Sequence, residues 1–139
     1  MSENSIDYVK KTRTYYQTNL GFIPPSVEVL GKYNPEALHG FMSIRESIMK
    51  DPPSGALPNT FKEILFVVLD CTRSNAEGAE AHAKTFIKIG GTVSQLVEAL
   101  ILASYVTGLE VLVNIGSKAV KAAEAAAAEA ESRGIAKGT

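Results

Sequence analysis

The stretch that decides the fold is residues 57–92, LPNTFKEILFVVLDCTRSNAEGAEAHAKTFIKIGGT. Its first half contains Ile64–Leu69, a run that would be apolar on every side of a helix, as is typical of a helix at the centre of a core. Its second half begins with a capping box, Ser74-Asn75-Ala76-Glu77, and ends at Gly90-Gly91. The stretch therefore predicts two consecutive helices that are joined by a short turn at Ser74 and pack antiparallel.

Helical signals continue on both sides of this stretch. Asn34-Pro35-Glu36 combines a capping side chain, a proline at the first helical position and an acid near the positive end of the helix dipole. Thr60-Phe61-Lys62-Glu63 and Thr92-Val93-Ser94-Gln95 each fit a capping box. No alternating run of apolar and polar residues is long enough to predict a strand. We therefore expect an all-α fold, a bundle of about six helices.

The length of 139 residues fits one domain, and we predict a single domain over residues 1–139. It would begin with a helix within residues 1–20 and end with an alanine-rich helix and a frayed tail over residues 122–139. The loop Asp51–Leu57 is interpreted as a link between subregions of this domain, because neither half should bury a core by itself. A domain of this size leaves apolar surface partly covered, which favours self-association.

Composition argues against several classes of protein. The net charge is −1, from 14 basic and 15 acidic residues without a long basic run, so we expect no binding to nucleic acid or to a membrane. The N-terminus does not resemble a secretory signal, and the longest apolar stretch, about Leu96–Val106, is too short to span a membrane. Cys71 is the single cysteine, so no disulfide can form within the chain. The expectation is a cytoplasmic protein.

The two helices joined at Ser74 carry residues suited to acid–base chemistry. Gly78 precedes His82 by one helical turn and would leave space beside the imidazole, at a cost of about 1 kcal/mol in helix propensity relative to alanine. Glu63 lies near the start of the preceding helix. A carboxylate beside an imidazole is the simplest pair for general acid–base catalysis, so we predict Glu63 and His82 as catalytic residues.

The spacing of these residues resembles the carboxymuconolactone decarboxylase and alkylhydroperoxidase D-like superfamily. In that pattern a Glu precedes a Cys-x-x-Cys pair by twelve positions, and a His follows the second Cys by four. The same offsets fall here on Glu63, Asn75, Gly78 and His82. The resemblance spans about residues 20–115 and implies the superfamily's helical fold. Other matching segments are Gly21–Pro24, Asn34–Leu38, Leu57–Pro58, Lys62–Leu65, His82–Lys84 and Gly90–Thr92.

Both redox cysteines of that pattern are missing, because Asn75 and Gly78 stand in their places. A Cys-x-x-Cys peroxidase needs an attacking and a resolving thiol, and Cys71 by itself cannot complete this cycle. The resemblance therefore implies the decarboxylase side of the superfamily, whose members use acid–base chemistry and no cofactor. Their substrates are small, anionic and enolisable, such as lactones that carry a carboxylate.

In this interpretation His82 delivers a proton to carbon after the loss of carbon dioxide, and Glu63 orients the imidazole or shares its proton. Asn75, Gly78 and Lys84 are predicted to contact the substrate, and Lys84 or Arg73 could hold its carboxylate. The histidines and acids show no spacing typical of metal ligands, so no metal is expected. The family also implies a homo-oligomer, a trimer or a hexamer.

Each predicted site residue has a structural interpretation as well. Glu63 could simply complete the capping box at Thr60, His82 could be a core histidine, and Asn75 fits a helix terminus. The protein could then be a non-enzymatic scaffold or ligand-binding member with a decayed redox site. In that case Phe66 or Phe86 would fill the site.

A third hypothesis is a peroxidase that uses Cys71 with an external reductant. The alternative for Cys71 is that of a small buried apolar side chain. Accessibility of its thiol distinguishes the two interpretations, because only an accessible thiolate can attack a peroxide.

Overall fold

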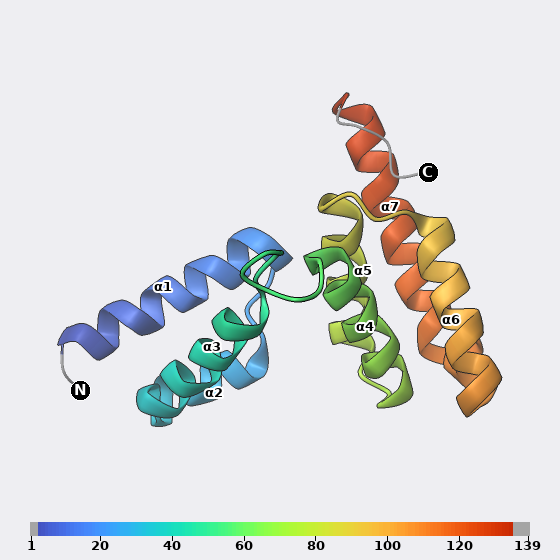
Figure 1. Ribbon diagram of the computed structural model, residues 1–139. Coiled ribbons are helices and arrows are strands. Elements are labelled where there is room, and N and C mark those ends of the chain that lie inside the picture. The colour runs from blue at the N-terminus through green and yellow to red at the C-terminus, as the bar shows by residue number, and fades with distance from the viewer. Residues whose placement is uncertain (1–2, 135–139) are drawn as a thin grey trace. The chain divides into compact units, whose positions relative to one another are not determined.

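A computed structural model gives the structure of the chain and describes residues 3–134. Within these residues the regular elements are seven α-helices and one π-helical segment, and no strand is present (Figure 1). The prediction of an all-α fold is confirmed. The chain divides into two compact units, Met1–Ala56 and Leu57–Thr139, at the loop expected between subregions. The single domain over residues 1–139 stays a prediction.

The first unit consists of three helices around a small core. They are α1 (Glu3–Leu20), α2 (Pro25–Tyr33) and α3 (Pro35–Ile48). Leu38 and Met42 of α3 are buried together with Val27 of α2. Asn34 caps α3 as the sequence predicts, because its side-chain oxygen accepts a hydrogen bond from the Ala37 N–H at 3.0 Å.

The second unit has a larger core. Its elements are α4 (Asn59–Thr72), α5 (Ala76–Lys88), α6 (Val93–Thr107), the π-helical η1 (Val111–Gly116) and α7 (Ser117–Ser132). α5 packs against both α4 and α7, and α6 lies alongside α7 (Figure 1). Ala79 and Ala83 of α5 are fully buried in one cluster with Ala119 and Ala123 of α7, and such small side chains let two helices pack closely. Nowhere in residues 3–134 is a helix both long enough and apolar enough to cross a membrane.

The start of α4 differs from the prediction in a way that matters for Glu63. The capping box expected at Thr60 is wrong, because α4 begins at Asn59, directly after Pro58, and no side chain caps it. The box at Thr92–Gln95 is confirmed, with both of its reciprocal hydrogen bonds present. Glu63 therefore has no capping role in this structure.

The alanine-rich helix predicted within residues 122–139 is the later part of α7, which begins at Ser117, directly after η1. A Cβ atom on Gly116 would lie 2.7 Å from the carbonyl oxygen of Val111, so glycine fits where the π-helical turn brings this backbone close. The predicted frayed tail beyond residue 134 lies outside the described residues.

Candidate active site

Glu63 and His82 meet between α4 and α5. The two helices follow one another in the chain and pack together. The Nδ1 atom of His82 lies 2.6 Å from the Oε2 atom of Glu63. The two residues that the sequence selects by spacing are therefore brought into hydrogen-bonding contact by the fold.

Burial makes the two members of this pair unequal. The Glu63 side chain is 2% exposed, whereas the His82 side chain is 16% exposed. An ionised carboxylate can only accept, so the Nδ1–H of His82 donates this hydrogen bond when Glu63 is ionised. Nε2 is then the ring nitrogen left to exchange a proton with a bound molecule. This is the arrangement of an oriented acid–base histidine.

An aromatic ring lies against the imidazole. The ring centroid of Phe66 is 4.7 Å from that of His82, and the two planes are inclined by 33°. Together with the hydrogen bond to Glu63, this contact restricts how the imidazole can rotate. From the sequence Phe66 is only a side chain that could fill the site, although its spacing of three residues from Glu63 already places both on one face of a helix.

Asn75 and Gly78, at the positions of the missing cysteines, form the start of α5. The Asn75 Oδ1 atom accepts a hydrogen bond from the Gly78 N–H at 3.2 Å, and its Nδ2 donates to Asp70 Oδ1 at 3.0 Å. The capping box predicted at Ser74 is wrong by one residue, since Ser74 has a φ of 58° and Asn75 is the cap. The interpretation of Asn75 as a helix-terminus residue is confirmed.

The space expected beside Gly78 is occupied by this cap. A Cβ atom on Gly78 would lie 2.4 Å from Asn75 Nδ2 and 2.5 Å from Asp70 Oδ2. Gly78 is thus explained by the close approach of two polar side chains. The roles of Asn75 and Gly78 as substrate contacts stay predictions.

Lys84 is not brought together with Glu63 and His82. It follows His82 by two residues, which places it about 200° further round α5, and its side chain is exposed. A substrate carboxylate held by Lys84 would therefore lie on another face of α5 than the imidazole. Its substrate-binding role also stays a prediction.

Cys71 lies near the end of α4 and is 3% exposed. Burial first, and then the negative charge of Asp70, raise the pKa of the Cys71 thiol from 9.0 to about 11. A thiol with this pKa is protonated at neutral pH, and the protonated form is not the nucleophile. Its neighbours in the core include Val67. The structure fits a buried apolar side chain and gives no support to a peroxidase.

A cavity of about 270 Å³ lies close to the pair along both helices. Of the residues that line it, Thr60 precedes Glu63 by about one turn, and Phe86 follows His82 by about one turn. The pair itself does not line this cavity. The other lining residues are Phe61, Ile64, Gln95, Glu98, Ala99 and Leu102. In the described part of the chain, no group of three or more His, Cys, Asp or Glu side chains is placed to hold a metal ion.

Comparison with known proteins identifies the family. No protein-family model matches the sequence, and no curated protein matches it. Among solved structures, a candidate carboxymuconolactone decarboxylase from Burkholderia xenovorans LB400 is 30% identical, with a TM-score of 0.79 over 94% of this chain and 97% of that chain. A carboxymuconolactone decarboxylase family protein from Legionella pneumophila is 25% identical, with a TM-score of 0.63 over 86% of this chain and 96% of that chain. The chain therefore belongs to the carboxymuconolactone decarboxylase family, as a member whose single cysteine leaves no Cys-x-x-Cys pair.

Proposed function

We propose that this protein is a cofactor-independent lyase or isomerase that uses acid–base chemistry on a small anionic, enolisable substrate of the carboxymuconolactone type. The observation that carries the proposal is the 2.6 Å hydrogen bond between Glu63 and His82. Burial of the carboxylate and partial exposure of the imidazole leave the histidine as the member that a substrate would meet. The names of the two similar structures support the decarboxylase type of reaction.

The proposed decarboxylation has two steps. The carbon–carbon bond to the substrate carboxylate breaks, carbon dioxide leaves, and the electron pair passes into the conjugated carbonyl as a dienolate. The dienolate carbon then takes a proton from Nε2 of His82. Glu63 accepts the Nδ1–H hydrogen bond and stabilises the imidazolium that precedes this transfer. Solvent returns the proton to Nε2 after the product leaves.

His82→Asn tests this function. The asparagine amide keeps an N–H near the position of Nδ1, but it cannot carry the transferred proton. We expect turnover of carboxymuconolactone to fall by roughly 10²- to 10⁴-fold, the usual contribution of a general acid or base. His39→Asn at the other histidine is the matched control and should keep full turnover. Unchanged turnover in folded His82→Asn protein would contradict the proposal.

A second candidate function is a non-enzymatic ligand-binding or scaffold member, and specific contacts favour it. Phe66 lies against the imidazole, and the cap around Asn75 fills the space beside Gly78. Both contacts occupy space that a substrate pocket beside His82 and Gly78 would need to leave open. In this case the wild-type protein would show no turnover of carboxymuconolactone, and His82→Asn would leave ligand affinity unchanged.

We also propose that the protein forms a homo-oligomer, a trimer or a hexamer. Support comes from large apolar side chains that are exposed on and after α6, with Tyr105 at 93% and Val106 at 80%. Exposed apolar patches of this kind are typical of contact surfaces. Val106→Glu should lower the molar mass measured by light scattering after size exclusion, whereas a wild-type monomer would contradict the proposal. Ile101, Leu102, Leu109 and Val113 belong to the same set of exposed side chains.

A further inference from the structure

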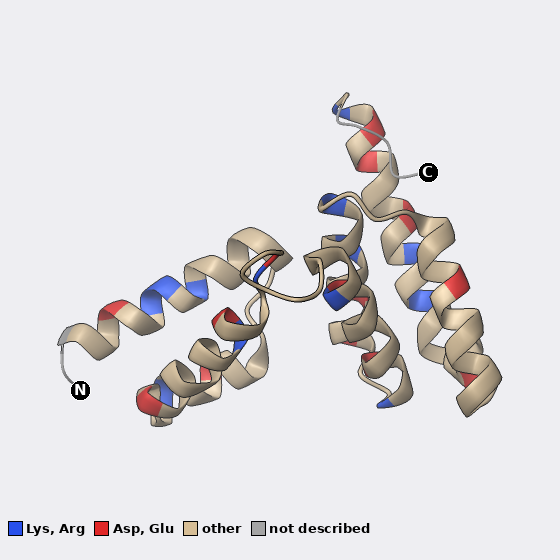
Figure 2. Ribbon diagram, in the orientation of Figure 1, with Lys and Arg blue, Asp and Glu red and all other residues tan. Residues whose placement is uncertain are grey.

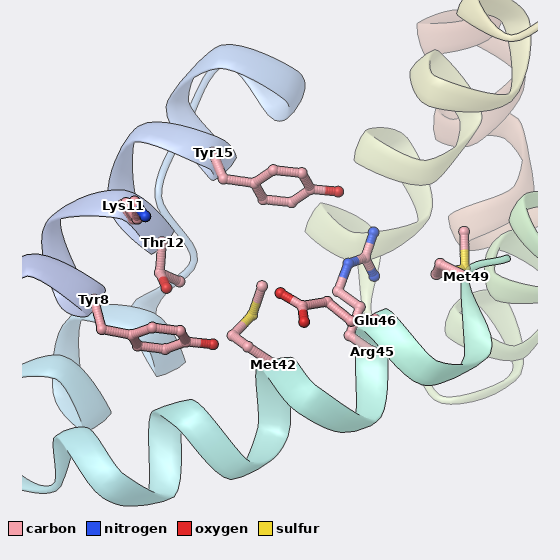
Figure 3. A pocket seen from close by; sticks show the side chains of 8 residues that line it. All are labelled: Tyr8, Lys11, Thr12, Tyr15, Met42, Arg45, Glu46 and Met49. Atoms are coloured by element: carbon pink, nitrogen blue, oxygen red, sulfur yellow. The ribbon is translucent and has the colours of Figure 1, made fainter. Parts of the chain in front are cut away.

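The first unit contains a cavity that the proposed catalytic chemistry does not use. It has a volume of about 460 Å³ and lies between α1 and α3 (Figure 3). Four lining residues come from α1 and four from α3 with its C-terminal cap, and both sets have the spacing i, i+3, i+4 and i+7, which is one face of a helix. The lining residues are Tyr8, Lys11, Thr12 and Tyr15 of α1, Met42, Arg45 and Glu46 of α3, and Met49, the C-cap of α3.

These two facing stripes differ from an ordinary helix contact. Helices that pack directly usually present apolar residues along such stripes. Here Met42 and the buried Thr12, which is 4% exposed, lie among the lining residues, and charged groups of both helices complete the lining. The space between the helices is therefore lined by apolar and polar groups together, and its volume falls within the range of small-molecule sites, roughly 300–1,000 Å³.

The charges of the lining favour an anion. Lys11 and Arg45 bring two positive charges to the cavity, and Glu46 brings one negative charge. Figure 2 shows basic positions in blue in the middle of α1, and of these Lys11 lines the cavity. A ligand with one negative group would bring the sum of these three lining charges to zero, whereas a cation would increase it.

The tyrosines add hydrogen-bond donors and ring surface. Burial, and then the charge of Glu46, raise the pKa of Tyr8, so its phenol keeps its proton and can donate. A hydrogen bond with Thr12 and a ring contact with His39, at 4.5 Å between centroids, help to hold Tyr8 in place. Tyr15 lines the same cavity, and Figure 3 shows its ring over the opening between the helices.

We propose that the cavity between α1 and α3 binds a small organic anion with a flat apolar body, of the aromatic carboxylate class. Lys11 and Arg45 attract the carboxylate, while the rings of Tyr8 and Tyr15 and the thioether of Met42 contact the apolar body. This site lies within the first unit, and the proposal does not rest on the catalytic role of Glu63 or His82.

The methionines provide a direct probe of this cavity. The chain has three methionines, and two of them, Met42 and Met49, line the cavity. Protein with ¹³C-labelled methionine methyl groups is titrated with benzoate, and Met42→Leu and Met49→Leu assign the signals. We expect both methyl signals to shift in a saturable way, by the ring current of the bound benzoate. Benzamide, which is uncharged, and benzylamine, which is cationic, should bind more weakly.

Substitutions of the charged lining residues then test whether these charges cause the preference for an anion. Lys11→Gln and Arg45→Gln should each weaken benzoate binding by roughly two- to fivefold, and Glu46→Gln should strengthen it by a similar factor. Lys10→Gln, at an exposed neighbouring lysine that does not line the cavity, is the matched control and should leave the affinity unchanged. The proposal is overturned if the methyl signals do not move, if benzamide or benzylamine binds as tightly as benzoate, or if Glu46→Gln weakens binding.

Discussion

The two histidines of this protein, one in each compact unit, show how much a single neighbour changes the chemistry of a side chain. His39 in the first unit and His82 in the second both lie against an aromatic ring, at centroid distances of 4.5 Å from Tyr8 and 4.7 Å from Phe66. His39 is exposed, whereas His82 is mostly buried and bonded to Glu63. The aromatic contact is common to both units, so the buried carboxylate is what distinguishes the candidate catalytic histidine.

This difference has an energetic side. A buried ionised group is costly unless it is paired, and Glu63 finds its partner in His82. The charged side chains that line the cavity of the first unit are Lys11, Arg45 and Glu46. Charged side chains therefore form a fixed internal pair in the second unit and part of the lining of the proposed binding cavity in the first.

The largest predicted difference in stability is between the variants that lack one or the other histidine. His82→Ala leaves the Glu63 carboxylate buried without its partner, so we expect a loss of roughly 3–5 kcal/mol in the free energy of unfolding. His39→Ala removes an exposed side chain and should cost less than about 1 kcal/mol. Urea unfolding followed by circular dichroism measures both. Equal losses of stability in the two variants would contradict the prediction that the buried pair of Glu63 and His82 contributes more than the exposed His39.

Cys71 is a second titratable group that is buried in the same unit. Its thiol has a pKa of about 11 in the folded protein, compared with an ordinary value of 9.0. Between these values the unfolded thiol has lost its proton while the folded thiol keeps it, so the unfolded state binds fewer protons and stability falls as pH rises. The full contribution is present below pH 9.0 and is lost as pH rises to about 11, on the order of 3 kcal/mol at most.

Unfolding in urea at several pH values between 8 and 11 tests this difference. The free energy of unfolding of wild-type protein should fall more steeply over that range than that of Cys71→Ala, which serves as the control without a thiol. Tyrosines titrate in both proteins, so their contribution cancels in the comparison. Parallel pH profiles would contradict the buried state of Cys71.

The smallest predicted effect compares two helix caps. Asn34 in the first unit and Asn75 in the second each accept a hydrogen bond from the start of the following helix. Asn34→Ala should cost about 1 kcal/mol. Asn75→Ala should cost more, about 1–2 kcal/mol, because the hydrogen bond to Asp70 is lost as well. Thermal unfolding of the two variants measures the order, and a larger loss for Asn34→Ala would contradict it.

The sequence predicts the candidate site well where a spacing fixes it. Glu63 and His82 follow from the offsets of the family pattern and from two antiparallel helices, and the structure brings them into contact. The sequence places the N-cap of α4 two residues late, at Thr60, because Thr60 and Glu63 satisfy the pattern of a capping box while the structure begins the helix directly after Pro58. A capping-box pattern identifies side chains that could cap a helix, but the residue at which the helical backbone begins determines whether they do so.

Other parts of the site depend on contacts that no spacing reveals. The hydrogen bond between Asp70 and Asn75 closes the space beside Gly78, and nothing in the sequence pairs these side chains. The cavity of the first unit was not predicted, because its stripes mix charged and apolar residues and so resemble a partly solvated helix face. The signal that could have revealed it is the i, i+3, i+4 and i+7 spacing that the lining residues share on the two helices.

The measurement that tests the central claim most directly is a ¹⁵N spectrum of the two imidazoles at a pH where both rings are neutral. The account predicts that His82 is a single tautomer with the proton on Nδ1, bonded to Glu63, and that exposed His39 is a mixture of tautomers. Glu63→Leu, which removes the hydrogen-bond acceptor, should remove the preference at His82 alone. A His82 ring with its proton on Nε2, or a spectrum that Glu63→Leu does not change, would contradict the account.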